Sequence, residues 1–326
     1  MNWIPVLATG ASATLLCGLW WRAMRGRLLD TPGDRSLHTH PTPTGGGVGI
    51  VTALQAGTLL AVPEPRDTAL ALLAPALLLC LTGLLDDLRG LGVWLRLALQ
   101  GACAAWVVFM LVPAPASALV LALAGLWVVG FTNAFNFMDG IDGFAATQAA
   151  FAGLAGALLL DDAGGRADTV LLLALTGAGA AGFLAWNWPP ARLFMGDAGS
   201  LPLGFLIAAL ALLSTAEGAL PGWCWLILLA PFLCDTGITL LLRAAARKPL
   251  LRAHREHAYQ RLAVRGHRPV TLGLLALDVV WLLPLAWLAA HRPSLAPLAA
   301  VSAVLPLCVV AGVVAWRHRE KGVERA

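Results

Sequence analysis

The chain has 326 residues, of which 59% are hydrophobic and only 12% are charged, and its formal net charge is +4. A water-soluble domain usually has about 25% charged residues, so this composition excludes an ordinary soluble protein. Apolar runs of about 20 residues recur along the chain, and such a run crosses a bilayer as a helix. Runs this continuous also exclude a membrane β-barrel, whose strands alternate polar and apolar residues.

The apolar runs predict an all-α, polytopic integral membrane protein with about 11 transmembrane helices. No internal repeat or low-complexity linker divides the chain, so we expect a single transmembrane domain over residues 1–326. The predicted spans are 3–21, 45–62, 69–85, 93–112, 116–135, 144–160, 169–186, 199–215, 221–242, 272–290 and 295–316.

Basic residues are divided unequally between the two sets of loops. The loops that follow the odd-numbered spans, together with the C-terminal tail, hold 18 Lys and Arg, whereas the opposite loops hold only Arg66, Arg166 and Arg292. The positive-inside rule therefore predicts a periplasmic N-terminus and a cytoplasmic C-terminus. Every unusually polar loop falls on the predicted cytoplasmic face, so we expect the active site there.

The loop between the first two spans contains the sequence DRSLHTHPTPTGGGVGI, with Arg35, His38 and His40. Its glycines allow two interpretations, a cradle for a phosphate or close helix packing. The third span ends in LLDDLRG, where Asp86 and Asp87 are adjacent. Two neighbouring carboxylates at a membrane edge repel each other unless a cation such as Arg or a divalent metal lies beside them. The alternative is an ordinary charged helix end.

The sequence NAFNFMDGIDG, residues 133–143, lies between two apolar runs. Asp139 and Asp142 are three residues apart, as are Asn133 and Asn136, so each pair would share a face if the segment were helical. Carboxylate and amide oxygens suit Mg²⁺ and the polar groups of a nucleotide. The alternative is a polar turn that caps the adjacent helices.

The motif LFMGDAGS places Asp197 at the start of the eighth span. A helix N-terminus favours a nearby phosphate, and Mg²⁺ often takes one or two carboxylates together with phosphate oxygens. Asp197 is therefore a candidate Mg²⁺ ligand, and the alternative is a simple helix cap.

The longest predicted cytoplasmic loop, 243–271, carries eight Lys or Arg and includes HREHAYQRL. We interpret His254, Arg255 and His257 as phosphate-binding residues; zinc binding by the two His is the weaker alternative because no Cys or second His pair is near. Asp235 and Asp278 lie within predicted spans, and acids there are functional candidates. Asp235 is about two turns from Arg243, which predicts a place on the cytoplasmic cavity.

These loops bring acids, amides, Arg and His to one membrane face. Phosphoryl transfer needs this chemistry, because it depends on positioning, on a cation that neutralises phosphate charge and on further cations at the leaving group. The chain has no Walker-type glycine loop, which argues against an ATPase.

The motifs PTPTGGG, LLDDLRG, NAFNFMDGIDG, LFMGDAGS and HREHAYQRL, in this order, resemble those of the polyprenyl-phosphate N-acetylhexosamine-1-phosphate transferases. This family includes phospho-MurNAc-pentapeptide translocase. The resemblance runs from Arg35 to about Thr271. It implies transfer of a sugar-1-phosphate from a UDP-sugar to undecaprenyl phosphate in the bilayer, with release of UMP and with Mg²⁺ or Mn²⁺ as cofactor.

The resemblance also implies roles for individual residues. Asp86 and Asp87 match the catalytic pair, one of which would deprotonate the lipid phosphate. Asp197 matches the catalytic Mg²⁺ ligand and Asn136 its amide co-ligand, while Arg96 matches a pyrophosphate contact that is Lys in many relatives. The remaining matches are substrate-binding: Asn133, Asp139 and Asp142 on the nucleotide side, and His254, Arg255 and His257 in the loop that faces phosphate and sugar.

One departure bears on the substrate. The translocase branch carries three consecutive His in the basic loop, whereas this chain reads His-Arg-Glu-His. HREHAYQRL and GHRPVTL are more similar to the branch that starts O-antigen and other surface polysaccharides, with GlcNAc-, FucNAc- or QuiNAc-type donors. The muramyl-pentapeptide substrate is the alternative within the family.

We expect direct attack of the lipid phosphate on the donor's β-phosphorus at the cytoplasmic side of a bacterial inner membrane. A covalent phospho-aspartate route is the rival mechanism. A transporter or flippase for an anionic solute is the alternative of a different class, but its site would lie near the midplane between matched repeats. We expect no nucleic-acid partner, and a homodimer is left open.

Overall fold

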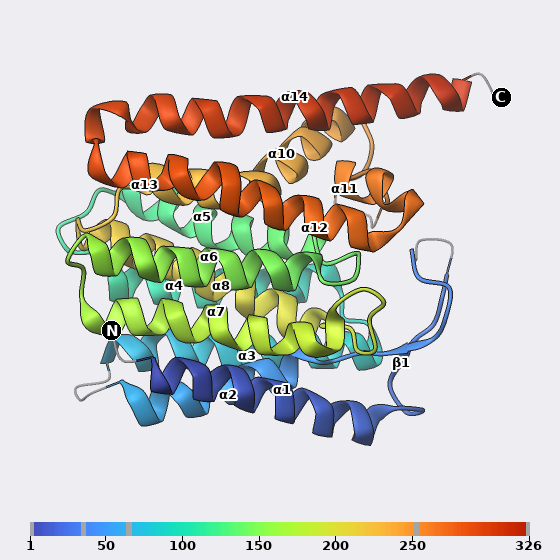
Figure 1. Ribbon diagram of the computed structural model, residues 1–326, viewed down its shortest axis with the longest axis horizontal. Helices are drawn as coiled ribbons and strands as arrows, with labels where there is room; N and C mark the ends of the chain where they lie inside the picture. Colours follow the sequence, from blue (N-terminus) through green and yellow to red (C-terminus); the bar gives the residue numbers. More distant parts are fainter. Residues whose placement is uncertain (1–2, 34–36, 63–66, 251–253, 324–326) are drawn as a thin grey trace.

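The computed structural model describes residues 3–33, 37–62, 67–250 and 254–323, so Arg35 and Arg66 lie outside the described residues. Its long helices run nearly parallel, and the two chain ends lie at opposite ends of the bundle (Figure 1). The first eight helices are α1 (Ile4–Met24), α2 (Gly47–Ala61), α3 (Asp67–Arg89), α4 (Val93–Leu111), α5 (Ala118–Phe137), α6 (Phe144–Asp162), α7 (Ala167–Asn187) and α8 (Asp197–Ala216).

The C-terminal half adds shorter and broken helices. They are α9 (Gly222–Leu228), α10 (Ala230–Ala245), α11 (Ala258–Leu262), the 3₁₀ turn η1 (Ala263–Arg265), α12 (His267–Leu277), the π-helical segment η2 (Asp278–Leu282), α13 (Leu283–His291), the 3₁₀ turn η3 (Pro293–Leu295) and α14 (Ala296–Val323).

Each of the 11 predicted spans corresponds to one helix or to consecutive helical segments in the described part of the chain, which confirms the polytopic all-α fold. Nine helical segments there are long and apolar enough to cross a membrane. The ninth predicted span is α9 with α10, bent by 75° at their junction, and the second is α2, which has only 15 residues.

Two helices at the centre of the bundle, α6 and α8, are buried along most of their length. Small residues allow this close packing. A Cβ on Gly47 of α2 would lie 2.1 Å from the backbone N of Gly199 in α8, and one on Gly83 of α3 would lie 2.2 Å from the backbone C of Asp197. The structure therefore favours the packing interpretation for Gly47 in the PTPTGGG motif.

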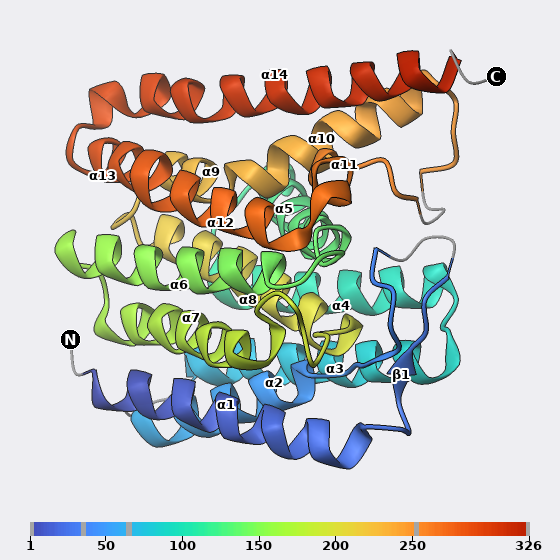
Figure 2. The same ribbon diagram turned by 45° about the vertical axis from the view of Figure 1, so that its right-hand side comes forward.

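A two-stranded hairpin leaves the bundle after α1. Strand β1 (Leu29–Asp30) pairs antiparallel with β2 (Thr42–Pro43). The residues after β2 join the loop before α8, because Phe194 N donates to Pro43 O at 2.8 Å and Gly46 N donates to Phe194 O at 2.9 Å. The hairpin lies at the same end of the bundle as α11 and the C-terminus (Figure 2).

Asp278, the second predicted intramembrane acid, is fully buried at the start of η2. Neither of its carboxylate oxygens has a hydrogen-bond partner among the described residues. The structure therefore gives no sign of a partnered structural role for Asp278 among the described residues.

Candidate active site

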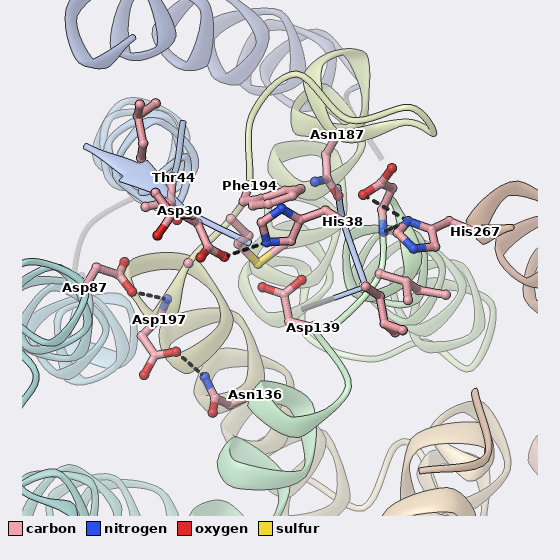
Figure 3. Close-up of a pocket in the computed structure, with 18 of the residues that line it drawn as sticks. Asp30, His38, Thr44, Asp87, Asn136, Asp139, Asn187, Phe194, Asp197 and His267 are labelled. Atoms are coloured by element: carbon pink, nitrogen blue, oxygen red, sulfur yellow. Dashed lines mark hydrogen bonds and ion pairs between the residues drawn. The ribbon is translucent and has the colours of Figure 1, made fainter. Parts of the chain in front are cut away.

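A cavity of about 480 Å³ opens at the hairpin end of the bundle. Figure 3 shows Asp87, Asp197 and Asn136 on one side of it and His267 on the other, with Asp139 and His38 between them in that view. The charged and titratable side chains among its described lining residues are five Asp and two His, with no Lys or Arg: Asp30, Asp87, Asp139, Asp142, Asp197, His38 and His267.

Asp87 ties the end of α3 to the start of α8. Its carboxylate accepts hydrogen bonds from the backbone N of Asp197 at 3.2 Å and of Ala198 at 3.5 Å. It therefore takes the place of a local N-cap, satisfying N–H groups that the helix leaves without partners. Gly196 makes the approach possible, because its φ is +68° and a Cβ there would lie only 2.4 Å from Asp87 Oδ2.

Asp86 has a different environment from its neighbour. It does not line the cavity: Oδ1 accepts from the backbone N of Leu91, and Oδ2 pairs with Arg96 in the first turn of α4. The same Arg96 Nη1 lies 3.0 Å from Asp197 Oδ2. The guanidinium thus bridges Asp86 and Asp197, so the cation predicted beside the adjacent acids pairs with Asp86 and not with Asp87.

Asn136 and Asn133, one helical turn apart on α5, face different partners. Asn136 Nδ2 donates to Asp197 Oδ1 at 2.7 Å and to Ser200 Oγ at 2.8 Å. Asn133 Nδ2 donates to Gln100 of α4 and to Val129 O, and Asn133 is not among the residues that line the cavity. Of these two residues, only Asn136 therefore presents its amide to the cavity.

The segment after Asn136 forms a turn between α5 and α6 rather than a continuous helix. Asp139 has no hydrogen-bond or ion-pair partner for its carboxylate among the described residues. Asp142 is tied down, because its Oδ2 accepts from Ala191 N at 3.0 Å and its Oδ1 lies 3.2 Å from His267 Nδ1. The two acids thus line one cavity without sharing a helical face.

The cavity carries an excess of negative charge. Burial, together with the charges of Asp197, Asp87 and Asp142, raises the pKa of Asp139 well above its usual value. An acid cluster of this kind fits a divalent cation, which would remove the repulsion. Among the described residues no three His, Cys, Asp or Glu side chains form a ready-made metal cage. Mg²⁺ does not need one, since it commonly takes one or two carboxylates and completes its shell with phosphates and water.

The basic loop is held by Asp235 of α10, which is buried. Its carboxylate accepts from four donors: Thr239 Oγ1 at 3.2 Å, His257 Nδ1 at 3.1 Å, Ala258 N at 3.0 Å and Tyr259 N at 2.8 Å. Asp235 therefore caps α11 and does not line the cavity, contrary to the sequence-based prediction.

Tyr259 completes the attachment of this loop. Its hydroxyl donates to Phe137 O at 2.8 Å, and its ring stacks on Phe144 with centroids 4.9 Å apart. A Cβ on Gly140 would lie 2.3 Å from the Tyr259 hydroxyl, so a glycine is needed at that position of the α5–α6 turn. The loop is thus fastened to the turn that carries Asp139.

The three predicted phosphate-binding residues of this loop lie outside the lining of the acidic cavity. His257 is buried and stacks on His254, with centroids 4.9 Å apart. Burial and the charge of His257 lower the pKa of His254 to about 4, so His254 is neutral at pH 7. Arg255 lines an adjacent cavity of about 410 Å³, which shares Leu37 and Gln260 with the acidic one.

The sequence analysis did not place His38 or His267 among the site residues. His38 Nε2 lies 3.4 Å from Asp30 Oδ2 of the hairpin, and its ring contacts Phe194 edge-on at 4.9 Å. His267 begins α12 within GHRPVTL, a motif that was noted only for its resemblance. The signal available in the sequence was the Gly266-His267 pair just before the tenth predicted span; in the structure Gly266 has a φ of +125°.

Comparison with known proteins identifies the family of this chain. The model of glycosyl transferase family 4 matches residues 69–215. The decaprenyl-phosphate N-acetylglucosaminephosphotransferase of Mycolicibacterium smegmatis is 30% identical over 308 residues, covering 79% of this chain and 75% of that protein. The chain belongs to the polyprenyl-phosphate hexosamine-1-phosphate transferase family.

Two further relatives show the breadth of this family. A probable undecaprenyl-phosphate N-acetylglucosaminyl 1-phosphate transferase of Bacillus subtilis is 29% identical and covers 78% of this transferase and 75% of its own length. A phospho-N-acetylmuramoyl-pentapeptide-transferase of Moorella thermoacetica is 35% identical, with coverage of 61% and 70%. The family implies a polyprenyl phosphate, a nucleotide sugar and a lipid bilayer as partners of the transferase.

An apolar groove of about 710 Å³ lies on the transferase between α4 and α5. It runs from Gly101 to Val112 along α4, about 17 Å at 1.5 Å per residue, and begins about 8 Å from Arg96 on the same helix. A Cβ on Gly101 of α4 or Gly125 of α5 would meet no atom within 4 Å. These glycines are therefore not required for packing within the chain.

We expect Asp235→Asn to loosen the basic loop of the transferase. A single amide oxygen replaces two carboxylate oxygens, so at least one buried donor loses its partner, at a cost of about 1–3 kcal/mol. Trypsin should then cleave faster at Arg247 or Arg255, and the midpoint of thermal unfolding should fall. Thr239→Val is the matched control, because it removes one donor and leaves the other three in place. Equal protease resistance of Asp235→Asn and wild type would contradict this account.

Proposed function

We propose that this transferase moves an N-acetylhexosamine-1-phosphate, of the GlcNAc, FucNAc or QuiNAc type, from a UDP-sugar to undecaprenyl phosphate and releases UMP. The reaction would take place at the cytoplasmic face of a bacterial inner membrane and start an O-antigen or another envelope polysaccharide. The observation that carries the proposal is an acidic polar cavity, whose Asp197 pairs with Arg96, together with an apolar groove that begins about 8 Å from Arg96 along the same helix.

The cavity suits the nucleotide diphosphate of the donor together with Mg²⁺. Asp197 would hold the ion, with Asp139 as the nearby acid that lacks another partner, and phosphate oxygens would complete its shell. Asn136 presents its amide nitrogen to Asp197, so the amide would have to turn to act as an oxygen ligand. When bound, the ion supplies charge neutralisation for the pyrophosphate.

Arg96 and Asp87 are the residues of the chain that act in the remaining steps. Arg96, oriented by Asp86 and paired with Asp197, would contact the phosphates beside the cavity. Asp87 lines the cavity and is held by the N-terminus of α8, so of the adjacent acids it is the one placed to accept a proton from the lipid phosphate. An oxygen of that phosphate forms a bond to the donor's β-phosphorus, and the bond from this phosphorus to the bridging oxygen of UMP breaks.

The groove suits the polyprenyl chain of the acceptor. Replacing Gly101 or Gly125 with Leu would fill it, and we expect the KM for undecaprenyl phosphate to rise about fivefold or more, since a well-placed apolar contact is worth about 1 kcal/mol or more. The KM for the donor should stay unchanged. Gly312→Leu on α14 is the matched control, because a Cβ there also meets no atom within 4 Å. Equal effects of all three changes on the acceptor KM would contradict this use of the groove.

The test of the proposed function is UMP release by the purified protein with undecaprenyl phosphate and Mg²⁺. The donors are UDP-GlcNAc, UDP-FucNAc, UDP-QuiNAc and UDP-MurNAc-pentapeptide, each with and without EDTA. Lipid- and Mg²⁺-dependent UMP from one of the first three donors supports the proposal. UMP only from the pentapeptide donor favours the other branch, and solute uptake into proteoliposomes without UMP would favour a transporter.

The same assay separates direct attack from a covalent intermediate. Direct attack needs the acceptor, so no UMP should form when undecaprenyl phosphate is left out. A burst of one UMP per protein molecule without acceptor would contradict direct attack and favour a phospho-aspartate.

A further inference from the structure

His267 lines the acidic cavity, and none of the roles described above uses it. It is the first residue of α12, an 11-residue helix, and its side chain is only 14% exposed. Figure 3 shows its ring on the side of the cavity away from Asp87 and Asp197. A buried ring in this position is held by the fold rather than free to rotate in solvent.

Asp142 fixes the orientation of this ring. His267 Nδ1 lies 3.2 Å from Asp142 Oδ1 and 3.3 Å from Asp142 N. Asp142 is itself anchored, through Oδ2 to Ala191 N at 3.0 Å and through its carbonyl oxygen to Thr271 Oγ1 at 2.8 Å. With Nδ1 engaged, Nε2 is the ring nitrogen that has no partner among the described residues and is available to a ligand.

The charges around the cavity indicate which part of a ligand reaches His267. Arg96 lies beside Asp197, so phosphate groups and their counter-ion are favoured on that side. The side of His267 carries Asp142, and Asp139 lies between, without a cation from Lys or Arg among the described lining residues. An acidic wall disfavours phosphate but accepts hydrogen bonds from hydroxyl and amide N–H groups.

We propose that His267, positioned by Asp142, is a specificity-determining contact for the uncharged half of the donor through a hydrogen bond from or to its Nε2. This inference rests on the proposed function and deepens it. The ligand chemistry is a neutral hydroxyl, carbonyl or amide group, which both the nucleobase and the acetamido sugar of a nucleotide sugar carry.

The test compares His267→Phe with the wild type. Phenylalanine keeps a ring of similar size and removes both nitrogens. The KM for the UDP-sugar should rise about tenfold, because a lost hydrogen bond to a buried group costs about a factor of 10 in affinity. The kcat and the KM for undecaprenyl phosphate should change less than threefold. An unchanged donor KM, or an equal change in both KM values, would overturn the proposal.

Two further variants separate binding from structural damage. His291→Phe is the matched control, because His291 also pairs with an acid, Asp162 at 2.8 Å, and does not line the cavity. It should leave the donor KM unchanged. Asp142→Asn should raise the donor KM, and the double variant with His267→Phe should be no worse than the more affected single variant, as expected when one residue acts through the other.

Inhibition by UMP identifies which neutral group is contacted. If the Ki of UMP rises with the donor KM in His267→Phe, the contact is to the nucleoside; if only the donor KM rises, it is to the acetamido sugar. The thermal shift induced by UDP-sugar, measured without lipid, tests binding of the donor independently of turnover. Wild type that shows the shift but no turnover contradicts the proposed function alone, and an equal shift in His267→Phe contradicts the role of His267.

Discussion

Asp197→Asn is expected to lower kcat about 1000-fold or more while leaving the fold intact. Asparagine keeps the size of the side chain and removes the charge on which Arg96 and the candidate ion site depend. A factor of 1000 corresponds to about 4 kcal/mol of lost transition-state stabilisation, which is in the range for removal of a preorganised electrostatic contact. The measurement is UMP release over a series of Mg²⁺ concentrations, with circular dichroism to compare helix content.

Asp162→Asn is the control for this experiment. Asp162 ends α6 on the opposite side of the bundle, where its partner is His291. Its replacement should leave kcat within about twofold of wild type. Residual activity of Asp197→Asn above about 10% of wild type at saturating Mg²⁺ would show that Asp197 does not hold the essential ion.

The second large effect is expected from a residue that touches no substrate. A Cβ on Gly83 of α3 would lie 2.2 Å from both the backbone C and O of Asp197. Gly83→Ala must therefore push α3 and α8 apart, and overpacking of this kind typically costs about 1–3 kcal/mol. The displacement also breaks the bonds from the start of α8 to Asp87, so we expect kcat to fall at least 100-fold together with a lower midpoint of thermal unfolding.

Gly273→Ala is the matched control for this prediction. Gly273 lies within α12, and a Cβ there meets no atom within 4 Å. Because alanine is a better helix former than glycine by about 1 kcal/mol, this variant should be as stable as wild type or slightly more so. If Gly83→Ala behaved in the same way, the close contact of α3 with α8 would not hold Asp197 in place.

The sequence predicted the spans well because length and hydropathy decide whether a helix can cross a bilayer. All 11 predicted segments are helical, and Asp86, Asp87, Asn136 and Asp197 do converge at one end of the bundle. The bend between α9 and α10 was not predicted, since the apolar run continues through it.

Side-chain partners were harder to predict than positions along the chain. Asn133 and Asn136 share a helix face, but neighbouring α4 and α8 decide that one binds Gln100 and the other Asp197. Asp139 and Asp142 looked like one helical face, whereas both lie in a turn that ends at Gly143, whose φ is +74°. Such outcomes depend on which helices become neighbours, and local spacing does not contain that information.

The basic loop shows the same limit. Its His residues were interpreted as ligand contacts because they stand among Arg and Lys in a predicted cytoplasmic loop. In the structure His257 is held by Asp235, more than 20 residues earlier in the chain, and His254 stacks on it. The sequence did not predict the apolar groove, since its lining residues are of the same kinds as those that face lipid.

The separation of the polar cavity from the apolar groove has a kinetic consequence. If the groove takes the lipid and the cavity takes the nucleotide sugar, the two substrates reach the reacting atoms from different phases. The rate should then follow the molar concentration of the donor in water but the mole fraction of undecaprenyl phosphate in the membrane or micelle. Adding detergent at a constant amount of undecaprenyl phosphate should slow the reaction by surface dilution, even though the total concentrations of donor and acceptor do not change.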